Sequence, residues 1–195
     1  MAETTVLPAP EDNRPRTILV ATSLASAAAF MFFVGLISFY ASERQTALGA
    51  GEGWLPSDDI SIVPGNMMFF TMWMSAATMG WALYSLKNND RINAYVALGL
   101  TAMFGLAVMN QTVFYYNDVG VALADGRAEL LFFVVTGSFL ALMGAAVLFL
   151  AFMTFRAMAG QFTDRNMDAM TAAAIFWWTT VAVYMIVWYT IYITK

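Results

Sequence analysis

The chain has 195 residues and a net charge of −4; 61% of the residues are hydrophobic, 11% are charged, and none is histidine or cysteine. The apolar residues form long blocks, which excludes an ordinary soluble domain, and the negative charge gives no reason to expect nucleic acid as a partner. Haem iron, copper and iron–sulfur clusters are held mainly by imidazole or thiolate, so we expect no cofactor and no metal in this chain.

The first segment is polar and contains three of the five prolines. It lacks the apolar core and the small-residue cleavage site of a signal peptide, so we predict a disordered cytoplasmic tail over residues 1–16. Residues 17–42 form the first apolar stretch. The connector that follows, over residues 43–64, is rich in glycine and acidic residues.

Four more apolar stretches follow, over residues 65–86, 92–117, 130–155 and 169–194, and none of the five contains a charged residue. Each exceeds the ~20 residues needed to cross a hydrocarbon core of ~30 Å. The later loops are short, and short loops force neighbouring helices to run antiparallel. The sequence therefore predicts an all-α integral membrane protein with a single five-transmembrane-helix bundle over residues 17–195.

The basic residues are distributed unequally between the two sides of this bundle. Six of the nine, Arg14, Arg16, Lys87, Arg91, Arg156 and Arg165, would lie on the side of the N-terminus, against three, Arg44, Arg127 and Lys195, on the other side. The positive-inside rule then places the N-terminus in the cytoplasm and the C-terminus outside.

Small residues recur four apart in three of the stretches, which is typical of closely packed membrane helices. They are Ala21, Ala25 and Ala29 in the first stretch, Ala76 and Gly80 in the second, and Gly137, Ala141 and Ala145 in the fourth. No proline interrupts a stretch, so we expect continuous helices rather than the broken helices of many transporters.

Three groups of residues inside the stretches are candidates for more than packing. The amides of Asn110 and Gln111 need partners in hydrocarbon, so they either bond across the bundle, which we favour, or face a partner subunit. Thioethers can bind Cu(I), but without Cys or His nearby we interpret the methionines of the second stretch, Met67, Met68, Met72, Met74 and Met79, as packing residues. The aromatic residues of the last stretch indicate interface anchoring and packing, with a quinone or lipid site as the less favoured interpretation.

The segment from Met31 to Arg44, with the sequence MFFVGLISFYASER, resembles the first helix of the short five-helix form of subunit III of the haem-copper oxidases. The resemblance continues along most of the chain, although its later motifs are less specific. Trp54 and Pro56 match a Trp-x-Pro loop, Thr136–Gly137 matches a Thr-Gly pair, and residues 176–178 match an aromatic run.

The sequence departs from that family at its ionisable membrane positions. The family's glutamate before the MFF pattern would fall at Ala29 or Phe30, and its glutamate on the third helix at Phe114. Its His-x-x-His pair would fall at Phe139 and Leu142. Its histidine and aspartate on the last helix would fall at Thr179 and Ala182. Loss of all these ionisable residues together is physically consistent, because no buried charge is left without its partner. It also places in doubt a proton role for this chain.

The resemblance implies a non-catalytic accessory subunit III of a respiratory haem-copper oxidase in a bacterial cell membrane. Haem and copper would reside in partner subunits I and II, and phospholipid would bind in a cleft between the first two helices and the last three. Residues expected at helix contacts or at the partner interface are Phe33, Gly35, Phe39, Tyr40, Gly137 and Ala141.

Three alternatives remain at this point. One is the accessory subunit of a nitric oxide reductase, and another is a small membrane carrier or channel. A membrane-bound oxygenase component is nearly excluded, because it would need histidine or carboxylate ligands for its metal.

Overall fold

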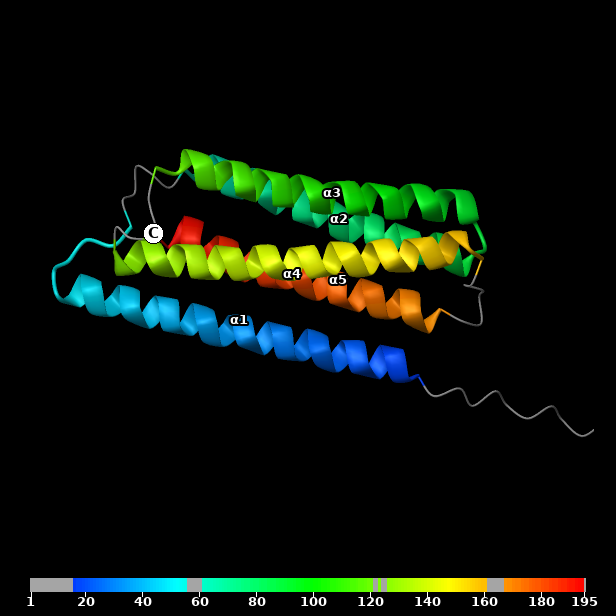
Figure 1. Cartoon of the computed structure of the whole chain (residues 1–195), viewed down its shortest axis with the longest axis horizontal. Helices are drawn as coiled ribbons and strands as arrows, with labels where there is room; N and C mark the ends of the chain where they lie inside the picture. Colours follow the sequence, from blue (N-terminus) through cyan, green and yellow to red (C-terminus); the bar gives the residue numbers. More distant parts are fainter. Residues whose placement is uncertain (1–15, 56–60, 121–122, 124–125, 161–166, 195) are drawn as a thin grey trace, which may run out of the picture.

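The computed structural model describes residues 16–55, 61–120, 123, 126–160 and 167–194, and every regular element in these ranges is helical (Figure 1). The helices are α1 (Thr17–Gly49), α2 (Ile62–Lys87), α3 (Arg91–Asp118), α4 (Arg127–Met158) and α5 (Asp168–Trp188), which continues as a short π-helix, η1 (Tyr189–Ile193). The predicted five-helix bundle is confirmed. The tail predicted to be disordered lies, except for Arg16, outside the described residues.

Local sequence signals mark several of the helix ends. Asp90 Oδ1 accepts a hydrogen bond from the backbone nitrogen of Asn93 at 3.3 Å, which caps the start of α3. Glycines with φ between 71° and 77° follow α1, α3 and α4, at Gly51, Gly120 and Gly160. Glycine adopts this left-handed conformation without steric cost. Each of these glycines lies two residues after the last helical residue, where it turns the chain away from the helix axis.

Helix α5 lies in the centre of the bundle and packs against α1, α2 and α4, while α3 packs against α2 and α4. In Figure 1, α1 and α3 accordingly lie on opposite sides of the molecule. The resemblance implied a cleft that separates the first two helices from the last three. That expectation is wrong, because α1 packs on α5 whereas α2 packs on α3 and α5.

Two ion pairs show which helix ends lie together. The Nε atom of Arg16, just before α1, lies 3.7 Å from Oδ2 of Asp168 at the start of α5. The Nε atom of Arg127, at the start of α4, lies 3.1 Å from Oε2 of Glu43 near the end of α1. Helices α1 and α5 therefore run parallel, and α4 begins at the end of the bundle where α1 finishes.

Four of the helices, namely α1, α3, α4 and α5 together with η1, are long and apolar enough to cross a membrane. Helix α2 is not among them, because hydroxyl, amide and Trp side chains reduce its hydropathy. However, the chain leaves α1 and enters α4 at the same end of the bundle, so α2 and α3 must cross together or not at all. Because α3 qualifies as a span, we infer that α2 crosses with it.

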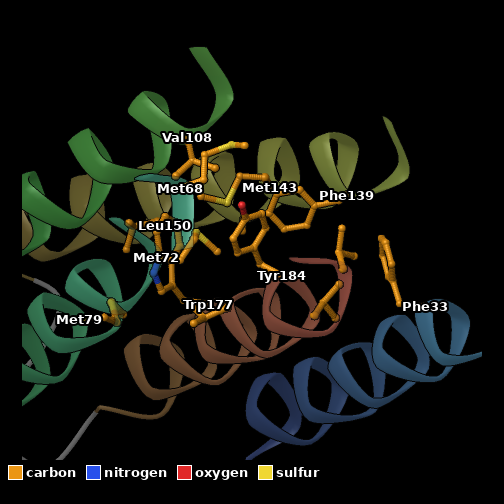
Figure 2. Close-up of a cluster of buried hydrophobic side chains, with 14 of the residues drawn as sticks. Phe33, Met68, Met72, Met79, Val108, Phe139, Met143, Leu150, Trp177 and Tyr184 are labelled. Atoms are coloured by element: carbon orange, nitrogen blue, oxygen red, sulfur yellow. The ribbon is translucent and has the colours of Figure 1, made fainter. Parts of the chain in front are cut away.

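The core between the helices is made of methionine, aromatic and small aliphatic side chains (Figure 2). Met72, Met79 and Met143 are completely buried, and Trp177 is 1% exposed. The indole nitrogen of Trp177 donates to Ser75 Oγ at 3.2 Å, and Tyr184 donates its hydroxyl to the carbonyl oxygen of Gly65 at 3.0 Å. These bonds join α5 to α2 across the bundle and satisfy polar atoms that have no access to water.

Candidate functional site

A groove runs beside α1 and is formed by two adjoining hollows of about 490 and 420 Å³. The first lies between α1 and α5 and the second between α5 and α2, and both are lined by Phe30, Trp178 and Ala182. We call the two together the α1–α5 groove. The aromatic rings of Phe30 and Trp178 and the small side chains between them give it an apolar, open wall.

One polar atom in this groove lacks a partner. Ser26 on α1 is only 3% exposed, and its Oγ has no hydrogen-bond partner among the described residues. The other hydroxyls in the groove are used within their own helices: Ser23 Oγ donates to the carbonyl oxygen of Leu19 and Thr179 Oγ1 to that of Ile175. Because the Ser26 Oγ atom is itself buried, a molecule in the groove would meet a largely apolar surface.

The positions where the resemblance would place ionisable residues fall into three places. Phe30, Thr179 and Ala182 line the α1–α5 groove, with Ala29 next to them on α1. Phe139 lies in the core against Tyr184, with the ring centroids 5.0 Å apart (Figure 2), and Leu142 packs half-buried beside the core. Phe114 lies on the outer surface of α3 and is 63% exposed. The positions on α1 and α5 thus line one hollow.

The six residues expected at helix contacts or at a partner interface do not share one environment. Phe33 and Tyr40 are each 2% exposed and belong to the core. Gly35 is exposed, and a Cβ built on it would have no atom within 4 Å, while Phe39 is 49% exposed. Gly35 therefore does not mark a close contact within this chain, and its place at a partner interface stays a prediction. Gly137 approaches the Tyr116 hydroxyl, and Ala141 is exposed.

The structure also contradicts the cross-helix bonding expected of the two amides on α3. Asn110 is exposed and Gln111 is half-buried, and neither forms a hydrogen bond with another described residue. The helix turns Thr112 inward instead, where its Oγ1 donates to the carbonyl oxygen of Val108 at 2.8 Å. The prediction failed because amide chemistry shows that a partner is needed but not which way the helix faces.

The tightest helix contacts occur at two glycines that the sequence analysis missed. A Cβ on Gly105 of α3 would lie 2.7 Å from the Trp177 ring and 2.8 Å from Val147, and a Cβ on Gly65 of α2 would lie 2.7 Å from the Tyr192 ring. A signal for Gly105 was available, because Ala97, Thr101 and Gly105 form a run of small residues spaced four apart.

The methionines of α2 do not converge on a common point. Met68, Met72 and Met79 face the core, whereas Met67 and Met74 are 59% and 56% exposed on the opposite side. The Met68 sulfur lies 3.4 Å from Thr112 Oγ1. The arrangement is that of packing residues around α2.

The sequence profile described as "Cytochrome c oxidase subunit III" matches residues 18–195. The chain belongs to the cytochrome c oxidase subunit III family. It is 25% identical to cytochrome c oxidase subunit 3 of Pylaiella littoralis over 83% of this chain and 60% of that protein. It is 28% identical to the subunit 3 of Xenopus laevis over 84% of this chain and 62% of that protein. The chain thus spans about three fifths of the length of these relatives.

The donor groups of this subunit III family member do not fit a haem or a copper ion. The sequence has no histidine or cysteine, and no cluster of Asp and Glu that could hold a metal ion occurs among the described residues. Soft and borderline metals need imidazole or thiolate ligands, or several converging thioethers. We therefore derive no chemical step through a metal in this chain.

Proposed function

We propose that this chain is an accessory, non-catalytic subunit of a respiratory haem-copper oxidase in a bacterial cell membrane. Subunits I and II would carry the haem and copper, and this chain would stabilise them by packing and by holding lipid. The family match over residues 18–195 carries the proposal. The lack of histidine and cysteine supports it, because the electron-transfer ligands must then come from other chains.

The α1–α5 groove supports phospholipid binding. Its hollows of about 490 and 420 Å³ adjoin and are walled by Phe30, Trp73 and Trp178. An acyl chain needs an apolar surface of this kind and no hydrogen bonds along its length. Bound lipid would also cover part of α1, since only 11% of the residues in its most apolar part are buried within the chain.

The lipid proposal predicts a specific loss when the groove is filled. Ala182→Trp places a large ring between α1 and α5, so phospholipid that co-purifies with the subunit should fall, as measured by mass spectrometry of extracted lipid. Leu148→Trp on α4, where the side chain is 73% exposed, is the matched control and should leave bound lipid unchanged. Equal lipid retention by both variants would contradict a site in this groove.

The nitric oxide reductase subunit and the carrier or channel can each be distinguished from an oxidase subunit. A nitric oxide reductase subunit would have the same bundle and differ only in the acceptor reduced by the partner, so turnover of the purified complex with oxygen or nitric oxide separates them. A carrier or channel needs a polar path, yet the apolar stretches contain no charged residue.

The proposal is tested by purification of the tagged chain in mild detergent. A large haem-containing membrane subunit should co-purify, and the complex should show a haem spectrum in visible light and reduce oxygen. Recovery of a chain that is free of any haem protein, under conditions that preserve other respiratory complexes, would contradict the proposal.

A further inference from the structure

One face of α3 is exposed along most of the helix. Its residues recur at spacings of four and three, as expected for a single stripe on an α-helix. The α3 stripe consists of Gly99, Met103, Leu106, Asn110, Phe114 and Asn117, all of which are exposed. The opposite face of the same helix, which includes Thr101, Gly105 and Thr112, is buried against α2, α4 and α5.

We infer from the position of Asn110 along α3 that its amide lies inside the hydrocarbon core. With a rise of ~1.5 Å per residue, α3 is roughly 42 Å long, and Asn110 lies roughly 12 Å from Asp118 at its end. A hydrocarbon core of ~30 Å centred on this helix would begin about 6 Å from each end, so the Asn110 amide lies inside it. Lipid chains at this depth offer no donor or acceptor.

Several other polar side chains in the spans form hydrogen bonds, although the Ser26 and Tyr115 hydroxyls and the Gln111 amide do not bond with a described residue. Thr101, Thr112 and Tyr116 of α3 all form hydrogen bonds, to Ala97, Val108 and Thr136 respectively. On the exposed face of α1, Ser38 donates to the carbonyl oxygen of Val34. Asn110 has two donors and a carbonyl acceptor and forms no bond with another described residue. The described residues therefore leave this amide available to bond with a group on another molecule.

We propose that the α3 stripe docks a transmembrane helix of the partner subunit, which presents a hydrogen-bonding side chain opposite Asn110. This proposal rests on the proposed function and names the contact face. Asn110 would form the polar contact, Leu106 and Phe114 would pack on either side of it, and Gly99 would allow close approach farther along the stripe.

The packing on either side of Asn110 favours a different chain over a second copy of this one. In a symmetric parallel pair, Leu106 would face Leu106 and Phe114 would face Phe114, with the two amides between them. These bulky pairs would hold the helix backbones apart, whereas an amide contact needs them close. A partner helix with small residues opposite Leu106 and Phe114 removes that conflict.

Cross-linking tests the face directly. A photoreactive phenylalanine analogue replaces Met103, which is 64% exposed in the stripe, or Leu148 on α4, which is 73% exposed, in the chain assembled with its partners. We expect a cross-link from position 103 to the large partner subunit and none from position 148. A cross-link from position 103 to another copy of the chain, or to lipid alone, would overturn the proposal.

Substitution of the amide supplies a second readout. Asn110→Leu should lower the amount of partner retained per chain by roughly threefold or more, as loss of one interhelical hydrogen bond in a membrane implies. The isolated subunit should keep or gain thermal stability, because an unpaired amide has been removed, and Asn110→Gln should restore part of the retention. Unchanged retention in Asn110→Leu would contradict the polar contact.

The two proposals can fail separately. If the wild-type chain co-purifies with no haem protein, the proposed function is wrong. If the wild-type complex is intact but position 103 does not reach the partner, only the docking face is wrong.

Discussion

Gly105 and Gly35 show how differently two glycines in membrane helices can be used. Gly105 has the Trp177 ring and Val147 where a Cβ would lie, while Gly35 has open space. Gly35 was predicted to lie at a contact because it belongs to the motif of the first helix, whereas no contact was predicted for Gly105. The motif therefore indicated the family but did not predict the close helix contact. Such a contact depends on which face of each helix is buried.

A larger side chain at Gly105 should destabilise the subunit. Gly105→Leu forces Trp177 and Val147 to move, and overpacking of this kind costs about 1–3 kcal/mol. Thermal unfolding of the purified subunit in detergent should show a lower midpoint than the wild type. Gly35→Leu is the control and should leave the midpoint unchanged; equal losses in the two variants would contradict the packing described for α3.

A carboxylate at position 114 should be costly. Phe114→Glu places an ionisable group on the α3 stripe, and a charge in the membrane costs up to ~3 kcal/mol at the helix centre and less near its end. Retention of the subunit in its complex and turnover should both fall. Phe155→Glu is the control. Phe155, near the end of α4, is 70% exposed and Phe114 is 63% exposed, so both acids bear the cost of exposure to lipid, but only position 114 lies on the α3 stripe.

The same experiment tests whether any acid-dependent proton role survives. No Asp or Glu lies within the five apolar stretches, so carbodiimides should not label an intramembrane residue of the wild type. Such labelling, or a Phe114→Glu complex with higher turnover and intact assembly, would show that a proton role persists.

At the scale of the helices, the apolar stretches predicted each element to within a few residues at most ends. Helix α1 is the exception, since it continues past residue 42 to Gly49 through a segment that has no proline or glycine before its end. Helix neighbours could not be predicted in the same way. The apolar stretches are hydrophobic all round, so their sequence does not show which face packs on which helix.

The crossing of α2 can be tested because the chain has no native cysteine. Single cysteines at Ala50 and Asn88, which flank α2, should react with a membrane-impermeant thiol reagent from opposite sides. Ala50→Cys should be labelled from outside and Asn88→Cys only after the membrane is opened. Labelling of both positions from the same side would contradict the crossing of α2, and the reverse pattern would contradict the predicted orientation.

For the molecule as a whole, the sequence predicted the family and the lack of redox ligands. It did not predict the α1–α5 groove or the α3 stripe. The α1–α5 groove joins Phe30 of α1 to Trp178 and Ala182 of α5, residues about 150 positions apart in the chain. The bundle combines a core closed by Trp177 and the methionines with an outer face on α3 that leaves Asn110 unsatisfied.

We propose that this subunit supports redox centres that other chains hold. The most direct measurement is the haem and copper content of the purified complex before and after this subunit is stripped from it with a harsher detergent. We predict that the remaining complex keeps all its haem and copper, and that the separated subunit is colourless and free of stoichiometric metal. Haem, copper or iron retained by the separated subunit in stoichiometric amount would contradict the claim.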